Sequence, residues 1–160
     1  MKYEDVSNAK EATEWLVKYA SRTSEEFASH EYTSAQAYAL LSHFTQPSEW
    51  LAVARCVGVP LPSRYEEILA RDPRLSEYYA REILKGPFPL AEATLAKDVK
   101  HGLSYALNRL KGRFPAFEAL LYAEGSLGQM ITYAMECVKG RIPEVESRIA
   151  QEPEAAMRYA

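Results

Sequence analysis

The stretch YALNRLKGRFPAFEALL, residues 105–121, is one of three related copies of a pattern in the second half of this 160-residue chain. With Φ for an apolar residue, the copies share the pattern Y-A-x-x-x-Φ-K-G-x-Φ-P-x-x-E-x-x-Φ and begin at Tyr79, Tyr105 and Tyr133. A fourth copy begins at Tyr159, so successive copies start 26, 28 and 26 residues apart. A period of this length predicts a repeat architecture, in which each unit buries its apolar face only against its neighbours.

Each copy predicts a helix, a tight corner and the start of a second helix. The Lys-Gly pair is typical of a helix end, because the helix dipole favours a cation in the last turn and glycine readily adopts the left-handed conformation that stops a helix. The Φ-Pro pair is typical of a helix start, and the glutamate after it falls in the first turn, where a negative charge is favoured. We therefore expect antiparallel helical hairpins, with left-handed backbone at Gly86, Gly112 and Gly140.

The chain as a whole is predicted to be all-α, because no alternating apolar pattern is bounded by hairpin-turn residues. We expect a single domain over residues 1–160, with a divergent N-terminal helical cap in residues 1–50 and stacked, solenoid-like helical repeats in residues 51–160. In the cap, helices are expected after Ser7, at Thr23, over residues 34–44 and from Pro47 to a stop at Gly58. Prolines and capping residues predict later helices over residues 73–84, 89–96, 99–110, 115–123, 126–138 and 143–150, and another from residue 153.

Composition limits the function classes. The formal net charge of −3 argues against a nonspecific nucleic-acid binder, which needs a strong basic excess. The acidic start predicts no secretion signal, and no apolar stretch approaches membrane-spanning length, so a soluble, cytoplasmic protein is expected. Cys56 and Cys137 have no C-x-x-C partner, which favours two small buried thiols over a disulfide or a zinc site.

Sequence patterns for catalysis or metal binding are missing. His30 and His43 have Glu25, Glu26 and Glu31 nearby, but none of the known metal-ligand spacings occurs. The sequence contains no nucleophile elbow, phosphate-binding loop or kinase motif. We expect a non-enzymatic protein with no metal and no cofactor. A cysteine and a histidine brought together from distant segments are the alternative left open.

One surface feature recurs at the same place in successive copies. We call it the basic corner: Lys85, Lys111, Arg113, Lys139 and Arg141. In a regular stack these cations form a row spaced by about 10 Å, the distance between packed helices, and could bind an acidic protein or a phosphate backbone. The structural alternative is that the lysines complement helix dipoles and that the two arginines pair with the glutamates that follow them.

The repeated tyrosines also allow two interpretations. Successive aromatic rings beside positive charge could stack on the bases of a single strand. Each tyrosine is, however, followed by alanine on an amphipathic helix and recurs once per copy, which favours a buried ladder.

The segments YALNRLKGRFP and YAMECVKGRIPEVE, which begin at Tyr105 and Tyr133, carry a family resemblance. They resemble the short Y-A-x-x-V-x-K-G-R-x-P-E-x-E helical repeats that recur in proteins of bacteriophages and bacteria, and the similarity covers roughly residues 79–160. The resemblance implies an α-helical repeat of phage or bacterial origin and no catalytic residue. The chain departs from the pattern at Pro87, where the arginine is missing, and near residues 125–128, where two residues are inserted.

The leading functional expectation is a non-enzymatic helical-repeat protein that binds another protein across the surface created by stacking. One alternative is a phage-encoded inhibitor of a host nucleic-acid-handling or defence enzyme. Another is an RNA or DNA binder that uses the basic corner. No membrane partner is expected.

Overall fold

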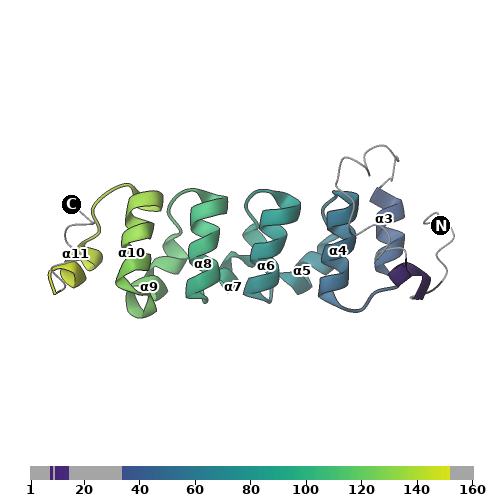
Figure 1. Cartoon of the computed structure of the whole chain (residues 1–160), viewed down its shortest axis with the longest axis horizontal. Coiled ribbons are helices and arrows are strands. Elements are labelled where there is room, and N and C mark those ends of the chain that lie inside the picture. Colours follow the sequence, from purple (N-terminus) through teal and green to yellow (C-terminus); the bar gives the residue numbers. More distant parts are fainter. Residues whose placement is uncertain (1–7, 9, 15–33, 152–160) are drawn as a thin grey trace.

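The computed structural model describes Asn8, residues 10–14 and residues 34–151 of the chain. Within these residues all regular structure is helical, which confirms the predicted all-α class. Figure 1 shows α4, α6, α8 and α10 side by side in one row, with α5, α7 and α9 between them and α3 and α11 at the two ends. The expected helix at Thr23, the helix from residue 153 and the fourth copy at Tyr159 lie outside the described residues.

The helices begin and end close to the expected positions. Each of α6, α8 and α10 continues into a π-helical turn, and a short 3₁₀ turn, Pro89–Ala91, precedes α7. Taken together, the six ranges predicted between residues 73 and 150 agree with the structure within one residue at each end. The bounds are α3 (Ser34–Leu41), α4 (Pro47–Val57), α5 (Ser63–Leu69), α6 (Pro73–Tyr79), α7 (Glu92–Leu95), α8 (Val99–Tyr105), α9 (Pro115–Glu124), α10 (Leu127–Tyr133) and α11 (Pro143–Ile149), with π-helical turns over Ala80–Leu84, Ala106–Leu110 and Ala134–Val138.

Capping side chains fix the starts of the helices in the row. The carboxylate of Asp72 accepts a hydrogen bond from the backbone N–H of Leu75 at 2.9 Å, and Asp98 accepts one from His101 at 2.8 Å. Ser126 does the same at the start of α10. These bonds satisfy N–H groups that have no partner inside the helix, so each helix starts at a defined residue.

The ends of the repeat helices differ from the expected geometry. Lys85, Lys111 and Lys139 adopt the left-handed conformation, with φ of 52°, 50° and 55°, so the expectation for the glycines that follow them is wrong. At the first corner, the carbonyl of Ala80 accepts hydrogen bonds from the N–H groups of both Lys85 and Gly86. Because this wide last turn closes at the lysine, the chain reverses one residue before the glycine. Helix α4 has no π-helical turn and ends as predicted, at a left-handed glycine.

Complementary residue sizes fit neighbouring helices together. A Cβ atom on Gly102 would lie 2.6 Å from Cδ2 of Phe117 and 2.7 Å from the carbonyl oxygen of Leu95, so the Phe117 ring packs directly on the backbone of α8. The equivalent positions 52 residues earlier hold Trp50 and Tyr65, whose ring centroids lie 4.8 Å apart. The repeat therefore accommodates residue pairs of different size at this contact.

We predict that Gly102→Ala lowers the free energy of unfolding by about 1–3 kcal/mol, because the added methyl group overpacks the contact with Phe117. Urea unfolding followed by circular dichroism measures the change. Gly112→Ala is the control, since the nearest atom to its added Cβ is the carbonyl oxygen of Leu110 at 3.8 Å. Equal stability of the two variants would contradict this account of the packing.

Candidate functional site

Three buried tyrosine hydroxyls join successive copies of the repeat. Tyr79, Tyr105 and Tyr133 are fully buried, which confirms the prediction of a buried ladder. Each hydroxyl lies between a glutamate and a backbone N–H of the segment that precedes its own copy, and we call this arrangement the hydroxyl bridge. Tyr79 donates to Glu66 at 2.6 Å and accepts from the N–H of Leu61 at 2.8 Å; for Tyr105 the partners are Glu92 at 3.0 Å and Phe88 at 2.7 Å, and for Tyr133 they are Glu118 at 2.9 Å and Phe114 at 2.6 Å.

The hydroxyl bridge explains why the motif contains both a tyrosine and a glutamate. The glutamate precedes its tyrosine by 13, 13 and 15 residues, so the longer spacing coincides with the two-residue insertion. The sequence analysis assigned the glutamate to the helix start and the tyrosine to the core, and missed the bond between them. The recurrence of both residues in every copy is the signal that could have indicated it.

Burial keeps these tyrosines in the neutral form. In Tyr79, Tyr105 and Tyr133 burial raises the phenol pKa above its ordinary value, and the neighbouring glutamate raises it further. A neutral hydroxyl is required for the bridge, because only the protonated form can donate to the carboxylate while accepting from the backbone.

The two arginines of the basic corner are paired with the glutamates that follow them, and Glu118, the partner of Arg113, also belongs to a hydroxyl bridge. Arg113 donates to both carboxylate oxygens of Glu118, at 2.9 and 2.7 Å, and Arg141 donates to Glu146. These hydrogen bonds from Arg113 lower the pKa of Glu118, against the effect of its partial burial. Both arginines therefore fit the structural alternative, in which each arginine pairs with the glutamate that follows it and orients its carboxylate.

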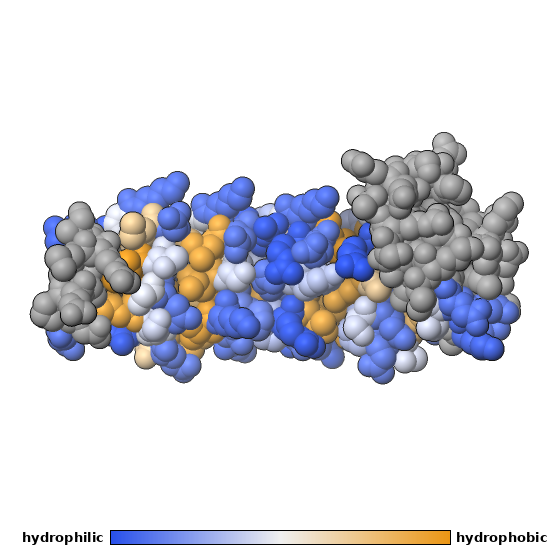
Figure 2. All heavy atoms as spheres, viewed as in Figure 1, coloured by the Kyte–Doolittle hydropathy of each residue, from blue (hydrophilic) through white to orange (hydrophobic). Residues whose placement is uncertain are grey.

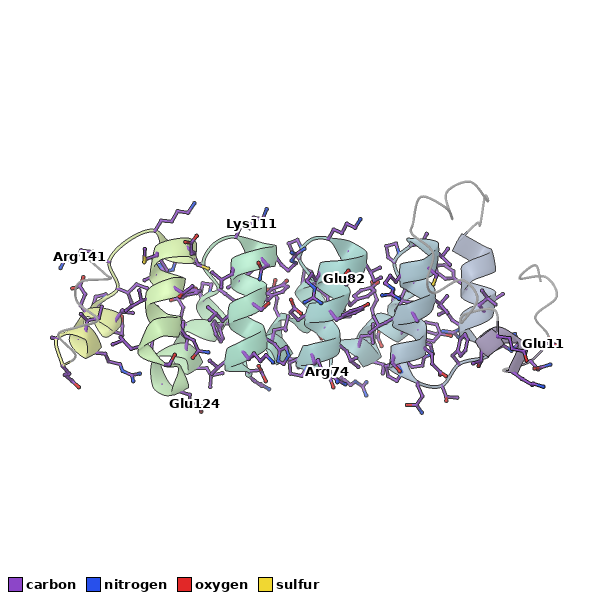
Figure 3. All side chains as sticks on the ribbon, in the orientation of Figure 1. Glu11, Arg74, Glu82, Lys111, Glu124 and Arg141 are labelled. Carbon is purple, nitrogen blue, oxygen red and sulfur yellow. The ribbon has the colours of Figure 1, made fainter. Side chains whose placement is uncertain are left out.

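The three lysines of the basic corner have a different environment. Lys85, Lys111 and Lys139 are exposed, and among the described residues none of them forms an ion pair. In Figure 3 the side chain of Lys111 extends from the end of its helix into solvent. The π-helical turns that lead to these lysines contact one another along the row. We call Lys85, Lys111 and Lys139 the lysine row.

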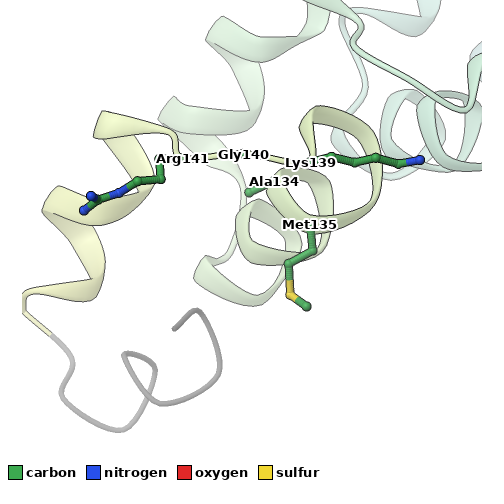
Figure 4. A pocket seen from close by; sticks show the side chains of 5 residues that line it. All are labelled: Ala134, Met135, Lys139, Gly140 and Arg141. Carbon is green, nitrogen blue, oxygen red and sulfur yellow. The ribbon is translucent and has the colours of Figure 1, made fainter.

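An open hollow of about 410 Å³ lies at the third corner, lined by Ala134, Met135, Lys139, Gly140 and Arg141. Figure 4 shows Lys139 and Arg141 pointing away from each other on either side of Gly140, so the two cations do not converge on one point. At the first two corners the π-helical turn contacts the next π-helical turn of the row. The hollow at the third corner lacks the converging polar groups of a small-molecule site.

The residues considered for catalysis do not form a reactive cluster. Cys56 and Cys137 are buried, and burial raises the pKa of both thiols, so they are poor nucleophiles. His101 Nδ1 lies 2.8 Å from the carboxylate of the capping residue Asp98, which gives it a local structural role. No group of three potential metal ligands occurs among the described residues, and His30 lies outside them. The described helices include none that is long and apolar enough to cross a membrane.

No protein-family model matches the chain, and searches of curated proteins and of solved structures find no match either. Function is therefore argued from the geometry of the repeat and its surface.

We predict that Tyr105→Phe lowers the free energy of unfolding by about 1–3 kcal/mol, because it leaves the buried N–H of Phe88 without an acceptor. Chemical denaturation measures the effect. Tyr38→Phe is the matched control, since its hydroxyl donates to the carbonyl of Pro60 at an exposed site, and a change of less than about 0.5 kcal/mol is expected there. Similar losses of unfolding free energy in both variants would show that the hydroxyl bridge stabilises the fold no more than an exposed hydrogen bond does.

The bridges also predict instability in alkali. Unfolded tyrosine loses its proton near pH 10, whereas the bridged tyrosines keep theirs to higher pH. The contribution is fully present below about pH 10 and is lost as the pH rises further, because the unfolded chain then binds fewer protons than the folded chain. Urea midpoints from pH 8 to 11 should fall less steeply in Tyr105→Phe than in the parent chain. An equal fall of the urea midpoint with pH in the two proteins would contradict the raised pKa of the bridged tyrosine.

The left-handed backbone at these lysines predicts that asparagine is tolerated better than valine at the same position. Lys111→Asn should change the free energy of unfolding by less than about 0.5 kcal/mol, because asparagine tolerates positive φ. Lys111→Val should lower it by about 1–2 kcal/mol, since a β-branched residue is strongly disfavoured there. Thermal melts of the two variants test this order, and equal melting temperatures would rule out the observed backbone conformation.

Proposed function

We propose that this chain is a non-enzymatic helical-repeat protein, built of stacked antiparallel hairpins, that binds another protein across the exposed face of its helix row. The observation that carries the proposal is a division of the repeat into two sets of residues. The tyrosine, alanine and glutamate shared by the copies are buried or bonded within the fold, whereas the helix positions that point away from the core are solvent-accessible and differ between copies. Repeat proteins of this design present broad surfaces whose side chains can change without disturbing the core. The resemblance to phage and bacterial helical repeats supports this class and such an origin.

The exposed face consists of three equivalent positions in each helix. They are residues 78, 81 and 82 in the first helix, 104, 107 and 108 in the second, and 132, 135 and 136 in the third. All are exposed or half-buried, and their residue types are Tyr-Arg-Glu, Ser-Leu-Asn and Thr-Met-Glu. We call these nine positions the variable face.

Polar and apolar character is unevenly distributed along the molecule. Figure 2 shows hydrophilic residues over α6 and an apolar band beside α8. At the polar end, Arg81 pairs with Glu77 and lies over the Tyr78 ring, 5.6 Å from its centroid. At the apolar end, the side chain of Met135 is prominent, since 54% of this residue is exposed. An arginine and a tyrosine held in place, together with an exposed methionine on the same face, are residue types that are enriched in protein interfaces.

Nucleic-acid binding is the second candidate, and one observation favours it. Residues 99–117 contain Lys100, Arg109, Lys111 and Arg113 and no carboxylate. The Nε of Arg109 is buried without a hydrogen-bond partner, and a guanidinium group can donate paired hydrogen bonds to a phosphate. The exposed carboxylates of Glu82 and Glu136 weigh against a long polyanion on the same face.

We predict that the double variant Asn108→Glu and Met135→Glu loses at least about tenfold in capture of protein partners from bacterial lysate, because two added carboxylates then lie on the variable face. The lysate is treated with nuclease, and bound proteins are identified by mass spectrometry. The matched control is Ile68→Glu and Leu90→Glu, which places the same charges on apolar residues that are 41% and 52% exposed elsewhere. Loss of all capture on nuclease treatment would favour the nucleic-acid alternative, and equal capture by both variants would contradict the proposal.

A further inference from the structure

The three residues of the lysine row have a left-handed backbone conformation that is unfavourable for lysine. Lysine is disfavoured at positive φ relative to glycine or asparagine, and the end of α4 shows that glycine serves in the same role. Three equivalent helix ends nevertheless place Lys85, Lys111 and Lys139 there, each beside a glycine. A residue held repeatedly in an unfavourable conformation indicates a role for its side chain.

These lysines differ from the arginines around them in their ion pairs. Arg81, Arg113 and Arg141 each form an ion pair with a glutamate, so their charges are partly compensated. The lysine row forms no ion pair among the described residues, and its members lie at equivalent positions of contacting helices. Uncompensated cations at a regular interval are complementary to anions at the same interval.

From this complementarity we propose that the lysine row binds an extended acidic segment of another protein that carries a carboxylate at every third residue. Packed helices lie about 8–10 Å apart, and an extended chain in the polyproline II conformation advances about 9 Å in a turn of three residues, so that every third side chain lies on the same face. This inference rests on the proposed protein-binding function and names the chemistry of the partner.

A protein segment fits this surface better than a nucleic acid does. Glu82 and Glu136 are exposed and lie three residues before Lys85 and Lys139 in the sequence. A continuous phosphate backbone would meet these carboxylates, whereas a peptide with spaced acids can place neutral residues beside them. Discrete carboxylates therefore gain the attraction of the row with less repulsion.

The test uses two fluorescein-labelled twelve-residue peptides of identical composition in an anisotropy titration at 50 mM salt. In one, four glutamates stand at every third position among glycine and serine; in the other, the four glutamates are consecutive. We expect the spaced peptide to bind about tenfold more tightly, since each exposed ion pair changes affinity by roughly two- to threefold. The advantage should shrink in 200 mM salt.

The variant Lys85→Asn, Lys111→Asn and Lys139→Asn should lose this advantage while keeping its fold, because asparagine tolerates positive φ. The control Arg74→Asn, Lys97→Asn and Lys100→Asn removes the same charge from exposed cations outside the row and should retain it. Equal affinity for both peptides, or equal loss in both variants, would overturn the proposal. Tighter binding of a twelve-nucleotide single strand than of the spaced peptide would also overturn it.

The outcomes separate the two protein-binding claims. If the acidic peptides show no preference but lysate capture still depends on the variable face, the lysine-row inference fails and the proposed function stands. If the spaced peptide binds but no protein is captured from lysate, the row recognises acidic segments and the broader proposal for the variable face fails.

Discussion

The structure depends on a buried tyrosine hydroxyl that is shared between two copies of one repeat. A helix of one copy supplies the tyrosine, and the corner of the preceding copy supplies both the glutamate and the backbone N–H. The corner needs this hydroxyl, since its proline start leaves a buried N–H outside the regular helix bonds. A buried N–H without a partner costs about 1–3 kcal/mol, so the three hydroxyl bridges together are comparable to a large part of a domain's net stability of about 5–15 kcal/mol.

The hydroxyl bridge also determines which parts of the surface are available for function. It occupies the tyrosine and the glutamate, and through Glu118 it engages Arg113, while Arg141 pairs separately with Glu146. The lysine row and the variable face are not used in this way. Residues that do not connect the copies are therefore the better candidates for binding. Of the basic corner, these are the three lysines, because both arginines are paired with glutamates.

Much of the fold could be predicted from the sequence because its signals are local. Pro73, Asp72 and Asp98 indicate helix starts by their own chemistry, and the six helix ranges after them agree with the structure. The left-handed lysines could not be predicted, because a π-helical turn is set by tertiary packing and shifts the stop by one residue. The bridges were missed for a related reason: a contact between residues 13 or 15 apart in different helices leaves no mark in helical periodicity. For the candidate site, the sequence predicted the place of the cations, but only side-chain geometry separated the paired arginines from the lysines.

The central claim is that tyrosine and glutamate act together across copies, and a double-mutant cycle between Tyr105 and Glu92 tests it most directly. The free energy of unfolding is measured by urea denaturation for the parent chain, Tyr105→Phe, Glu92→Ala and the double variant. Since the two side chains share one hydrogen bond, the account predicts a coupling free energy of at least about 1 kcal/mol. Additive losses within about 0.3 kcal/mol would contradict it and would mean that the two residues stabilise the fold independently.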